Sequence, residues 1–161
     1  RRLFLGENVT LLFENRETML WQIHEMVRAE GLTDTAAIAH ECDTYSQLLP
    51  QEHSLSATLF IELPQDSNIR QGLDRLLGLD EHTYMEIDGQ RLKAHFDPSQ
   101  YNQERISSVH YLNFIFTEEL KQHFISPKAN VIVGFDHPNY TCQNQVQGET
   151  LRSLVDDFRT P

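Results

Sequence analysis

The chain has few of the features that stabilise secreted proteins or anchor membrane proteins. Its 161 residues include only two cysteines, Cys42 and Cys142, which is no framework of disulfide bonds. We expect no signal peptide, and the chain has no apolar run near the ~18 residues that a membrane-spanning helix requires. We therefore expect a protein of the reducing cytoplasm, with Cys42 as a small buried side chain on a helix and Cys142 in a loop.

Positive charge is also scarce. Thirteen Lys and Arg residues stand against 24 Asp and Glu residues, which gives a net charge of -11 at pH 7. Such a charge repels the phosphate backbone of nucleic acids and the surface of anionic lipids. We therefore expect neither nucleic acid nor a membrane as a partner, and instead a cationic or protein partner.

The motifs of several large enzyme classes are missing. There is no glycine-rich phosphate loop, no G-x-S-x-G nucleophile motif and no pair of cysteines at zinc spacing. His24-Glu25 and His40-Glu41 each begin like a zinc-protease helix, but Arg28 and Thr44 stand where that motif needs its second histidine. The sequence thus has residues that can bind a metal, without a metal signature.

Hydrophobic residues make up 39% of the chain, which suffices for a core in one domain spanning residues 1–161. Apolar residues alternate with mostly polar ones from Leu55 to Leu63, which predicts a half-buried strand. The first residue is Arg1 rather than Met, so we expect that an upstream segment is missing.

Asp88-Gly89 is the strongest turn signal, because both residues tolerate positive φ angles. It predicts a two-residue hairpin loop in which Glu86 faces Arg91. Counting outward, His82 would face His95 in a solvated pair.

Apolar residues at helical spacing predict a helix from Arg16 to Glu30 and a second one that ends before Pro50, which together form a helical hairpin. Residues 109–116 and 131–135 are apolar on both faces, as in central strands covered by helices. We therefore predict an α+β fold, a mostly antiparallel β-sheet with an N-terminal helical hairpin and further helices packed against it.

Two places carry candidate chemistry. Glu25 and Glu41 lie on the two adjacent helices, so their carboxylates could share a proton or a metal ion. The alternative is that both are solvated or ion-paired, which is more common for a glutamate on a helix.

The segment from Asp136 to Tyr140 presents an acid, an imidazole and a phenol directly after an apolar strand. Its alternative is an ordinary turn, because Asp, Pro and Asn all favour turns.

Two other histidines favour structural interpretations. His110 shares a strand face with apolar residues, which is typical of a hydrogen-bonded core histidine. Glu119 and His123 are four residues apart on a short predicted helix, a spacing that also fits a weak surface pair.

Several stretches, in a fixed order, resemble a bacterial family known only as a domain of unknown function: LLFENRETMLWQIHEMVRAE, HECDTYSQLLP, LSATLFIEL, RISSVHYLNFIF and FDHPNY. The resemblance covers essentially the whole chain. Genes of that family commonly neighbour those of a rubrerythrin and an iron-sulfur oxidoreductase, which implies a link to peroxide defence or electron transfer. The family pattern matches this chain at Glu14, Asn15, Glu25, Glu30, Glu41, Tyr45, Asp136, His137 and Tyr140. His24, His40 and His110 do not belong to it.

The resemblance leads to one structural prediction and two hypotheses of function. A single functional cluster would unite Glu25, Glu41, Tyr45, Asp136, His137 and Tyr140. The first hypothesis is a cytoplasmic accessory or binding protein of a rubrerythrin-linked redox or peroxide-defence system, with a rubrerythrin-like or iron-sulfur protein as its partner. The second is a metal-binding protein or metalloenzyme that holds iron or another divalent metal with Glu25, Glu41 and His137.

Overall fold

The computed structural model describes residues 1–64, 68–97 and 106–159. It has eight strands: β1 (Arg2–Leu5), β2 (Val9–Phe13), β3 (Ser54–Ile61), β4 (Thr83–Ile87), β5 (Gln90–Phe96), β6 (Val109–Ile115), β7 (Val131–His137) and β8 (Tyr140–Val146). The helices are α1 (Arg16–Glu30), α2 (Thr35–Ser46), α3 (Ile69–Asp74), α4 (Glu118–Phe124) and α5 (Gly148–Asp157), with a short 3-10 helix η1 (Leu79–Glu81).

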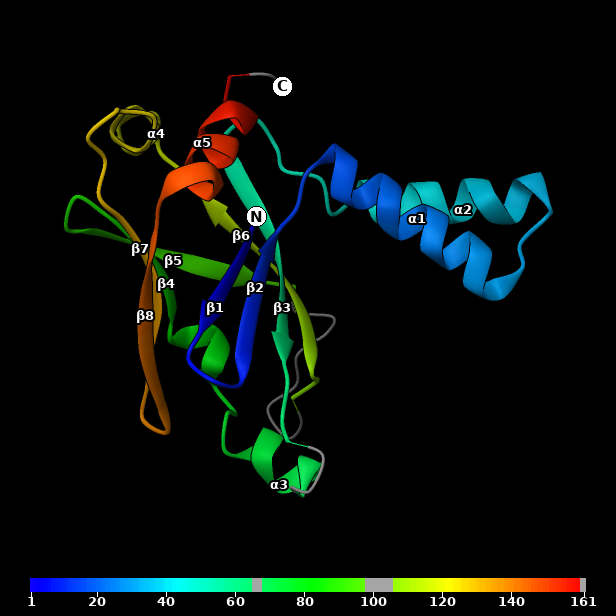
Figure 1. Cartoon of the computed structure of the whole chain (residues 1–161), viewed down its shortest axis with the longest axis horizontal. Coiled ribbons are helices and arrows are strands. Elements are labelled where there is room, and N and C mark those ends of the chain that lie inside the picture. Colours follow the sequence, from blue (N-terminus) through cyan, green and yellow to red (C-terminus); the bar gives the residue numbers. More distant parts are fainter. Residues whose placement is uncertain (65–67, 98–105, 160–161) are drawn as a thin grey trace.

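All eight strands form one antiparallel sheet in the order β1-β2-β3-β6-β5-β4-β7-β8. The sheet curls until its two edge strands meet (Figure 1). Side chains of β8 bridge this seam, because the Tyr140 hydroxyl donates to the Leu5 carbonyl at 2.6 Å and the Asn144 amide donates to the Phe4 carbonyl at 3.0 Å. The sheet is therefore a nearly closed barrel, and its edges are covered by side chains rather than left open.

Apolar side chains fill the interior of the barrel. The predicted strand is confirmed as β3, and its apolar residues Leu55, Ala57, Leu59 and Ile61 are buried. The strand is not half-buried as predicted, because Ser54, Ser56 and Thr58 on its other face are buried too. Phe114 of β6 pairs in register with Leu55 and lies against Phe13, with ring centroids 6.3 Å apart. Because inward residues of every strand meet at one axis, the packed interior is the core of the molecule.

The predicted hairpin at Asp88-Gly89 is confirmed. Ile87 pairs with Gln90 and Glu86 with Arg91, and both turn residues have positive φ angles of 50° and 85°. The predicted outer pair of histidines does not form. The paired register ends at Tyr84, His82 follows η1 and bonds Asp136, and His95 pairs with Asn113 of β6.

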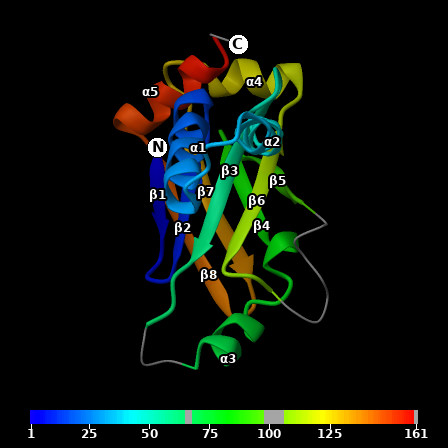
Figure 2. The same ribbon diagram turned by 90° about the vertical axis from the view of Figure 1, so that its right-hand side faces the viewer.

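Helices α1 and α2 form an arm that projects sideways from the barrel (Figures 1 and 2). Asn15 caps α1 by accepting a bond from the Thr18 backbone at 3.0 Å, and Gly31 ends the helix in the left-handed conformation. Asp34 caps α2 in the same way. The arm is thinly packed, because α1 buries only Met19 and Ile23 and α2 buries no residue.

The remaining helices lie at the two ends of the barrel. Figure 2 shows α4 and α5 at the end near the C-terminus and α3 at the opposite end. Phe116, Phe124 and Phe158 pack edge to face with centroids 5.0 to 5.5 Å apart, which seals the α4 and α5 end. Among the described residues, no helix has the length and apolar character needed to cross a bilayer.

The predicted fold class is wrong. The chain begins with two strands rather than a helical hairpin, and the helices cap or leave a curled sheet instead of covering an open one. The prediction that residues 109–116 are apolar and covered on both faces also fails, because Asn113 and Ile115 point outward and are exposed. Alternation with period two is the same for an open sheet and a barrel, so it does not reveal curvature.

Candidate binding site

Glu25 lies on the projecting arm and is ion-paired. Its carboxylate accepts a bond from the Arg28 guanidinium, one turn along α1, at 2.7 Å. This bond lowers the pKa of Glu25. The structure thus shows the ion-paired alternative for this residue.

Glu41 and Tyr45 stand one turn apart on α2, close to the base of the arm. Tyr45 approaches Tyr111 on the outside of β6. Burial raises the pKa of the Tyr45 hydroxyl, and the nearby Tyr111 and Glu41 raise it further. Cys42, on the same helix, is half-buried rather than fully buried as predicted.

Asp136 lies on the outer surface at the end of β7 that leads into β8. It accepts bonds from His82 Nδ1 at 3.1 Å and from Arg91 Nη1 at 2.9 Å. The bond from His82, followed by that from Arg91, lowers the pKa of Asp136. Its carboxylate therefore joins β7 to the β4–β5 hairpin.

His137 and Tyr140 hold neighbouring chain segments together. His137 is buried, accepts from the Asn139 backbone at Nδ1 (3.2 Å) and contacts the Leu77 carbonyl through Nε2 (2.8 Å). This pair of bonds fits a ring that accepts at Nδ1 and donates through Nε2. Tyr140 bonds Leu5 across the seam and also accepts from the Asn8 backbone at 3.3 Å. Both residues therefore have a structural role, because each bonds a segment that is distant in sequence.

The structure does not bring the six predicted cluster residues together. Glu25, Glu41 and Tyr45 belong to the arm, whereas Asp136, His137 and Tyr140 lie at the β7–β8 side of the barrel (Figure 1). Within residues 1–64, 68–97 and 106–159, no group of three or more His, Cys, Asp or Glu side chains is arranged to hold a metal ion. Metal binding by Glu25, Glu41 and His137 stays a prediction without a shared site.

The other titratable candidates have structural surroundings. His110 is a core histidine as predicted, since it is buried and contacts the Ser107 carbonyl at 2.7 Å. His123 faces Asp88 at 3.6 Å. Cys142 lies in β8, so its prediction as a loop residue is wrong, and burial raises the pKa of its thiol.

Sequence patterns did not reveal the role of Glu14, which follows β2 at the root of the arm. Its carboxylate is buried, accepts from the Thr58 hydroxyl of β3 at 2.5 Å and is also bonded by the Thr18 hydroxyl of α1. The only signal was its match to the family pattern. Glu14 therefore ties the first turn of α1 to the barrel wall.

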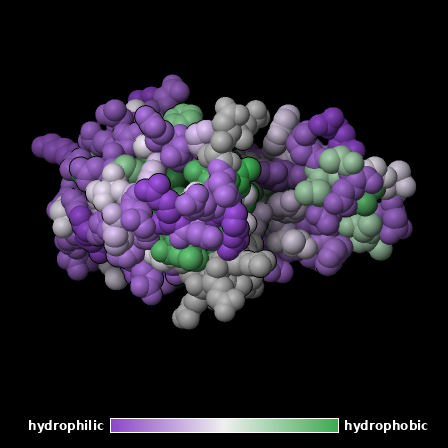
Figure 3. Space-filling model, turned by 90° about the horizontal axis from the view of Figure 1, so that it is seen from below, coloured by the Kyte–Doolittle hydropathy of each residue, from purple (hydrophilic) through white to green (hydrophobic). Residues whose placement is uncertain are grey.

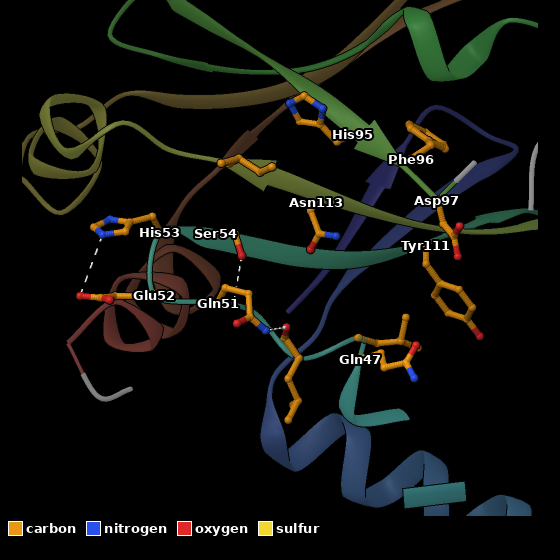
Figure 4. Close-up of a pocket in the computed structure, with 13 residues that line it drawn as sticks. Gln47, Gln51, Glu52, His53, Ser54, His95, Phe96, Asp97, Tyr111 and Asn113 are labelled. Carbon is orange, nitrogen blue, oxygen red and sulfur yellow. Dashed lines mark hydrogen bonds and ion pairs between the residues drawn. The ribbon is translucent and has the colours of Figure 1, made fainter. Parts of the chain in front are cut away.

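A groove lies on the outside of the barrel beside the base of the arm (Figure 4). Its volume is about 640 Å³. It is lined by Gln47, Leu48, Leu49, Gln51, Glu52, His53, Ser54, His95, Phe96, Asp97, Tyr111, Asn113 and Ile115. The connection between α2 and β3 forms one wall, and β5 forms the other.

The floor consists of outward side chains of β6. Tyr111, Asn113 and Ile115 alternate with the buried Leu112 and Phe114, so the sheet pleat sends them to the outside. His95 of β5 pairs with Asn113 in the sheet register. Because Ser54 and Ser56 of β3 bond the chain that follows α2, that chain holds its position beside the floor.

Acidic and neutral polar groups mark the two ends of the groove. Figure 4 shows Asp97 and Tyr111 at one end and Glu52 with His53 at the other. His53 lies 3.9 Å from Glu52 and 3.6 Å from Glu118 of α4. No Lys or Arg is among the described residues that line the groove. The groove combines a floor of mixed polarity and an apolar wall with carboxylates at its rim.

Fold and site define a class of protein: an eight-stranded, nearly closed antiparallel barrel with a filled interior, a projecting helical arm and a groove on its outer wall. The chain belongs to the family described as "Protein of unknown function (DUF3501)", whose model matches residues 1–158. The family membership expected from the sequence is thus confirmed, while the gene neighbourhood stays a prediction.

A solved structure shares this fold. It is described as the crystal structure of a novel protein of unknown function from Burkholderia pseudomallei K96243, with a TM-score of 0.88 and 31% sequence identity. The match covers 98% of this chain and 83% of that chain. No curated protein matches the sequence.

Proposed function

We propose that the protein is a binding protein that recognises a protein partner through its helical arm and has no chemistry of its own. The observation that carries this proposal is the exposed Trp21 on the acidic, projecting α1. Its side chain is 67% exposed, and the neighbouring Leu20 is 40% exposed. Tryptophan is enriched among the residues that dominate binding energy at protein interfaces.

The arm has the charge to attract a basic partner. Residues 16–46 contain six acidic and two basic side chains. Trp21 and Glu17 border a shallow hollow of about 310 Å³ together with Gln22. Figure 3 also shows apolar residues in pale green on the arm, where Ala36 and Ala39 are exposed. An apolar anchor surrounded by carboxylates suits a basic protein surface.

The partner that we propose is a rubrerythrin-like or iron-sulfur protein of the cytoplasm. Support for this choice is the family resemblance with its gene neighbourhood, together with the net charge of -11, which favours association with a basic patch. The protein would then serve peroxide defence or electron transfer as an accessory. The two unpaired cysteines suit a reducing compartment.

Calorimetry with each purified partner at low and at moderate ionic strength tests the proposal. Binding should weaken as salt rises, because exposed charges are screened over roughly 10 Å at 0.1 M salt. Trp21→Ala should weaken binding by about tenfold or more, and Glu17→Lys should slow association. The matched control is Glu149→Lys on α5, where the side chain is 96% exposed and far from the arm in sequence.

Equal effects of Glu17→Lys and Glu149→Lys would contradict recognition through the arm, as would the absence of a complex at low salt. Metal analysis of protein prepared without oxygen tests the alternative function, a metalloenzyme. Stoichiometric iron, manganese or zinc that is lost on both Glu25→Ala and His137→Ala, with peroxide turnover by the isolated chain, would replace the binding protein with a metalloenzyme.

A further inference from the structure

We propose that the groove beside the base of the arm binds a small organic cation, an amine or guanidine attached to a flat apolar body. The inference is independent of the arm and its partner. It rests on the shape of the groove, the polar groups on its floor and the sign of the charges at its rim.

The shape suits a small molecule. A volume of about 640 Å³ lies within the range typical of ligand sites. Leu48 and Leu49 supply an apolar wall, and Ile115 is 52% exposed on the floor. An isoleucine left in contact with water in a concave place gains from being covered by an apolar ligand body.

The floor offers hydrogen-bonding groups at its centre. His95 and Asn113 form a cross-strand pair, so their side chains lie on the same outer face of the sheet about 5 Å apart at Cβ. The carboxamide oxygen of Asn113 accepts hydrogen bonds, and an imidazole nitrogen that carries no proton does so too. Tyr111 adds an aromatic face, which attracts a cation through its π electrons.

The charges select a cation over an anion. Glu52 and Asp97 contribute carboxylates at opposite ends of the groove, and the described lining residues include no Lys or Arg. Lys121 lies outside the lining and brings one positive charge near the Glu52 end, where its ammonium bonds the Glu52 backbone carbonyl at 3.3 Å, so the two carboxylates still outnumber it. A carboxylate ligand would therefore meet repulsion where an ammonium ligand meets attraction.

Three probes that share one aromatic body separate these contributions: 2-phenylethylamine, 2-phenylethanol and phenylacetate. Each is titrated into isotope-labelled protein and followed by backbone amide shifts. The amine should produce saturable shifts centred on residues 95–97 and 111–115, the alcohol weaker ones and phenylacetate none. Equal responses to amine and phenylacetate, shifts centred elsewhere, or no response to the amine would overturn the proposal.

Variants then assign the charge effect. Glu52→Gln and Asp97→Asn should each weaken amine binding by roughly twofold to fivefold, the scale of a partly exposed ion pair, and leave alcohol binding unchanged. Ile115→Ala should weaken both ligands together. Glu149→Gln on α5 removes the same charge outside the groove and should change neither. If it weakens amine binding as much as Glu52→Gln, the effect is one of net charge and the site is rejected.

Discussion

The barrel and the arm use polar residues in opposite ways. In the barrel, Asp136, His137 and Tyr140 are each bonded to segments distant in sequence. Their polar groups therefore hold parts of the barrel together. On the arm, Glu25 bonds only its own helix, and Trp21 is exposed. Polar residues are therefore bonded across distant segments in the barrel, whereas on the arm Glu25 is bonded within its own helix.

Packing explains this difference. Each central strand has neighbours on both sides, and its inward side chains meet a common core, whereas α1 and α2 have only each other and the barrel wall at their root. Glu14 makes the joint between the two regions through Thr18 and Thr58. A region of few buried contacts opens locally at lower free energy than a closed barrel.

The largest expected effect is a difference in stability between a variant in the barrel core and a variant on the arm. Phe114 is fully buried and packs on Phe13, so Phe114→Ala should lower the free energy of unfolding by about 3–5 kcal/mol. Trp21→Ala, a similar loss of volume on the arm, should change it by less than about 0.5 kcal/mol. Chemical denaturation measures both. Similar losses for the two variants would show that the arm is as tightly packed as the barrel.

A smaller effect is expected at the seam. Tyr140→Phe removes the hydroxyl that bonds Leu5 at 2.6 Å, and should cost about 1 kcal/mol. Amide hydrogen exchange should then quicken in β1 and in the turn that follows it before it changes in β3, because Leu5 and Asn8 lose their bonds to the hydroxyl. Tyr45→Phe on α2 is the control and should leave exchange in β1 unaltered. Unchanged protection of β1 in Tyr140→Phe would mean that the seam does not depend on this bond.

The smallest effect concerns pH and the buried His110. Burial lowers its pKa below the ordinary value of 6.5, although the bond to the Ser107 carbonyl opposes the shift. As the pH falls below about 6.5, the unfolded chain takes up a proton that the folded chain resists, so stability decreases. Above that pH both states are neutral and His110 contributes nothing to the slope.

His110→Gln, which keeps a donor for Ser107 but does not titrate, should reduce the loss of stability between pH 7.5 and pH 5.5. Thermal unfolding of both proteins across this range measures the difference. The exposed His40 on the arm provides the control, since His40→Gln should follow the parent protein. Parallel curves for the parent and His110→Gln would refute the assignment.

Local features of the molecule were predictable where neighbours in sequence decide them. The Asp88-Gly89 turn, the alternation in β3 and the buried His110 depend on backbone conformation or on side-chain polarity within a few residues. The supposed cluster failed to assemble for the opposite reason. Whether Glu25 approaches His137 depends on where the arm leaves the barrel, and no pattern in either segment encodes that direction.

The outer groove also could not be predicted from the sequence. Tyr111 and Asn113 stand in a strand whose pattern predicted burial on both faces. They lie on the outer face of the curled sheet, where Tyr111 is half-buried near Tyr45 of α2 and Asn113 is exposed. Only the meeting of β5, β6 and the chain after α2 makes them a floor with walls.

By itself, the sequence determined β3, the Asp88-Gly89 hairpin, the two helices of the arm, the acidic charge and the family, since each depends on composition or on residues close along the chain. It did not reveal β8, where Cys142 was expected in a loop. The tertiary structure alone decided that the sheet closes, that α1 and α2 project and that a groove forms beside their base. These outcomes depend on contacts such as Tyr140 with Leu5 and Glu14 with Thr58, which join residues far apart in sequence. Hydrophobic alternation indicates which face of a strand is buried, but only the tertiary structure shows which residues pack against that face.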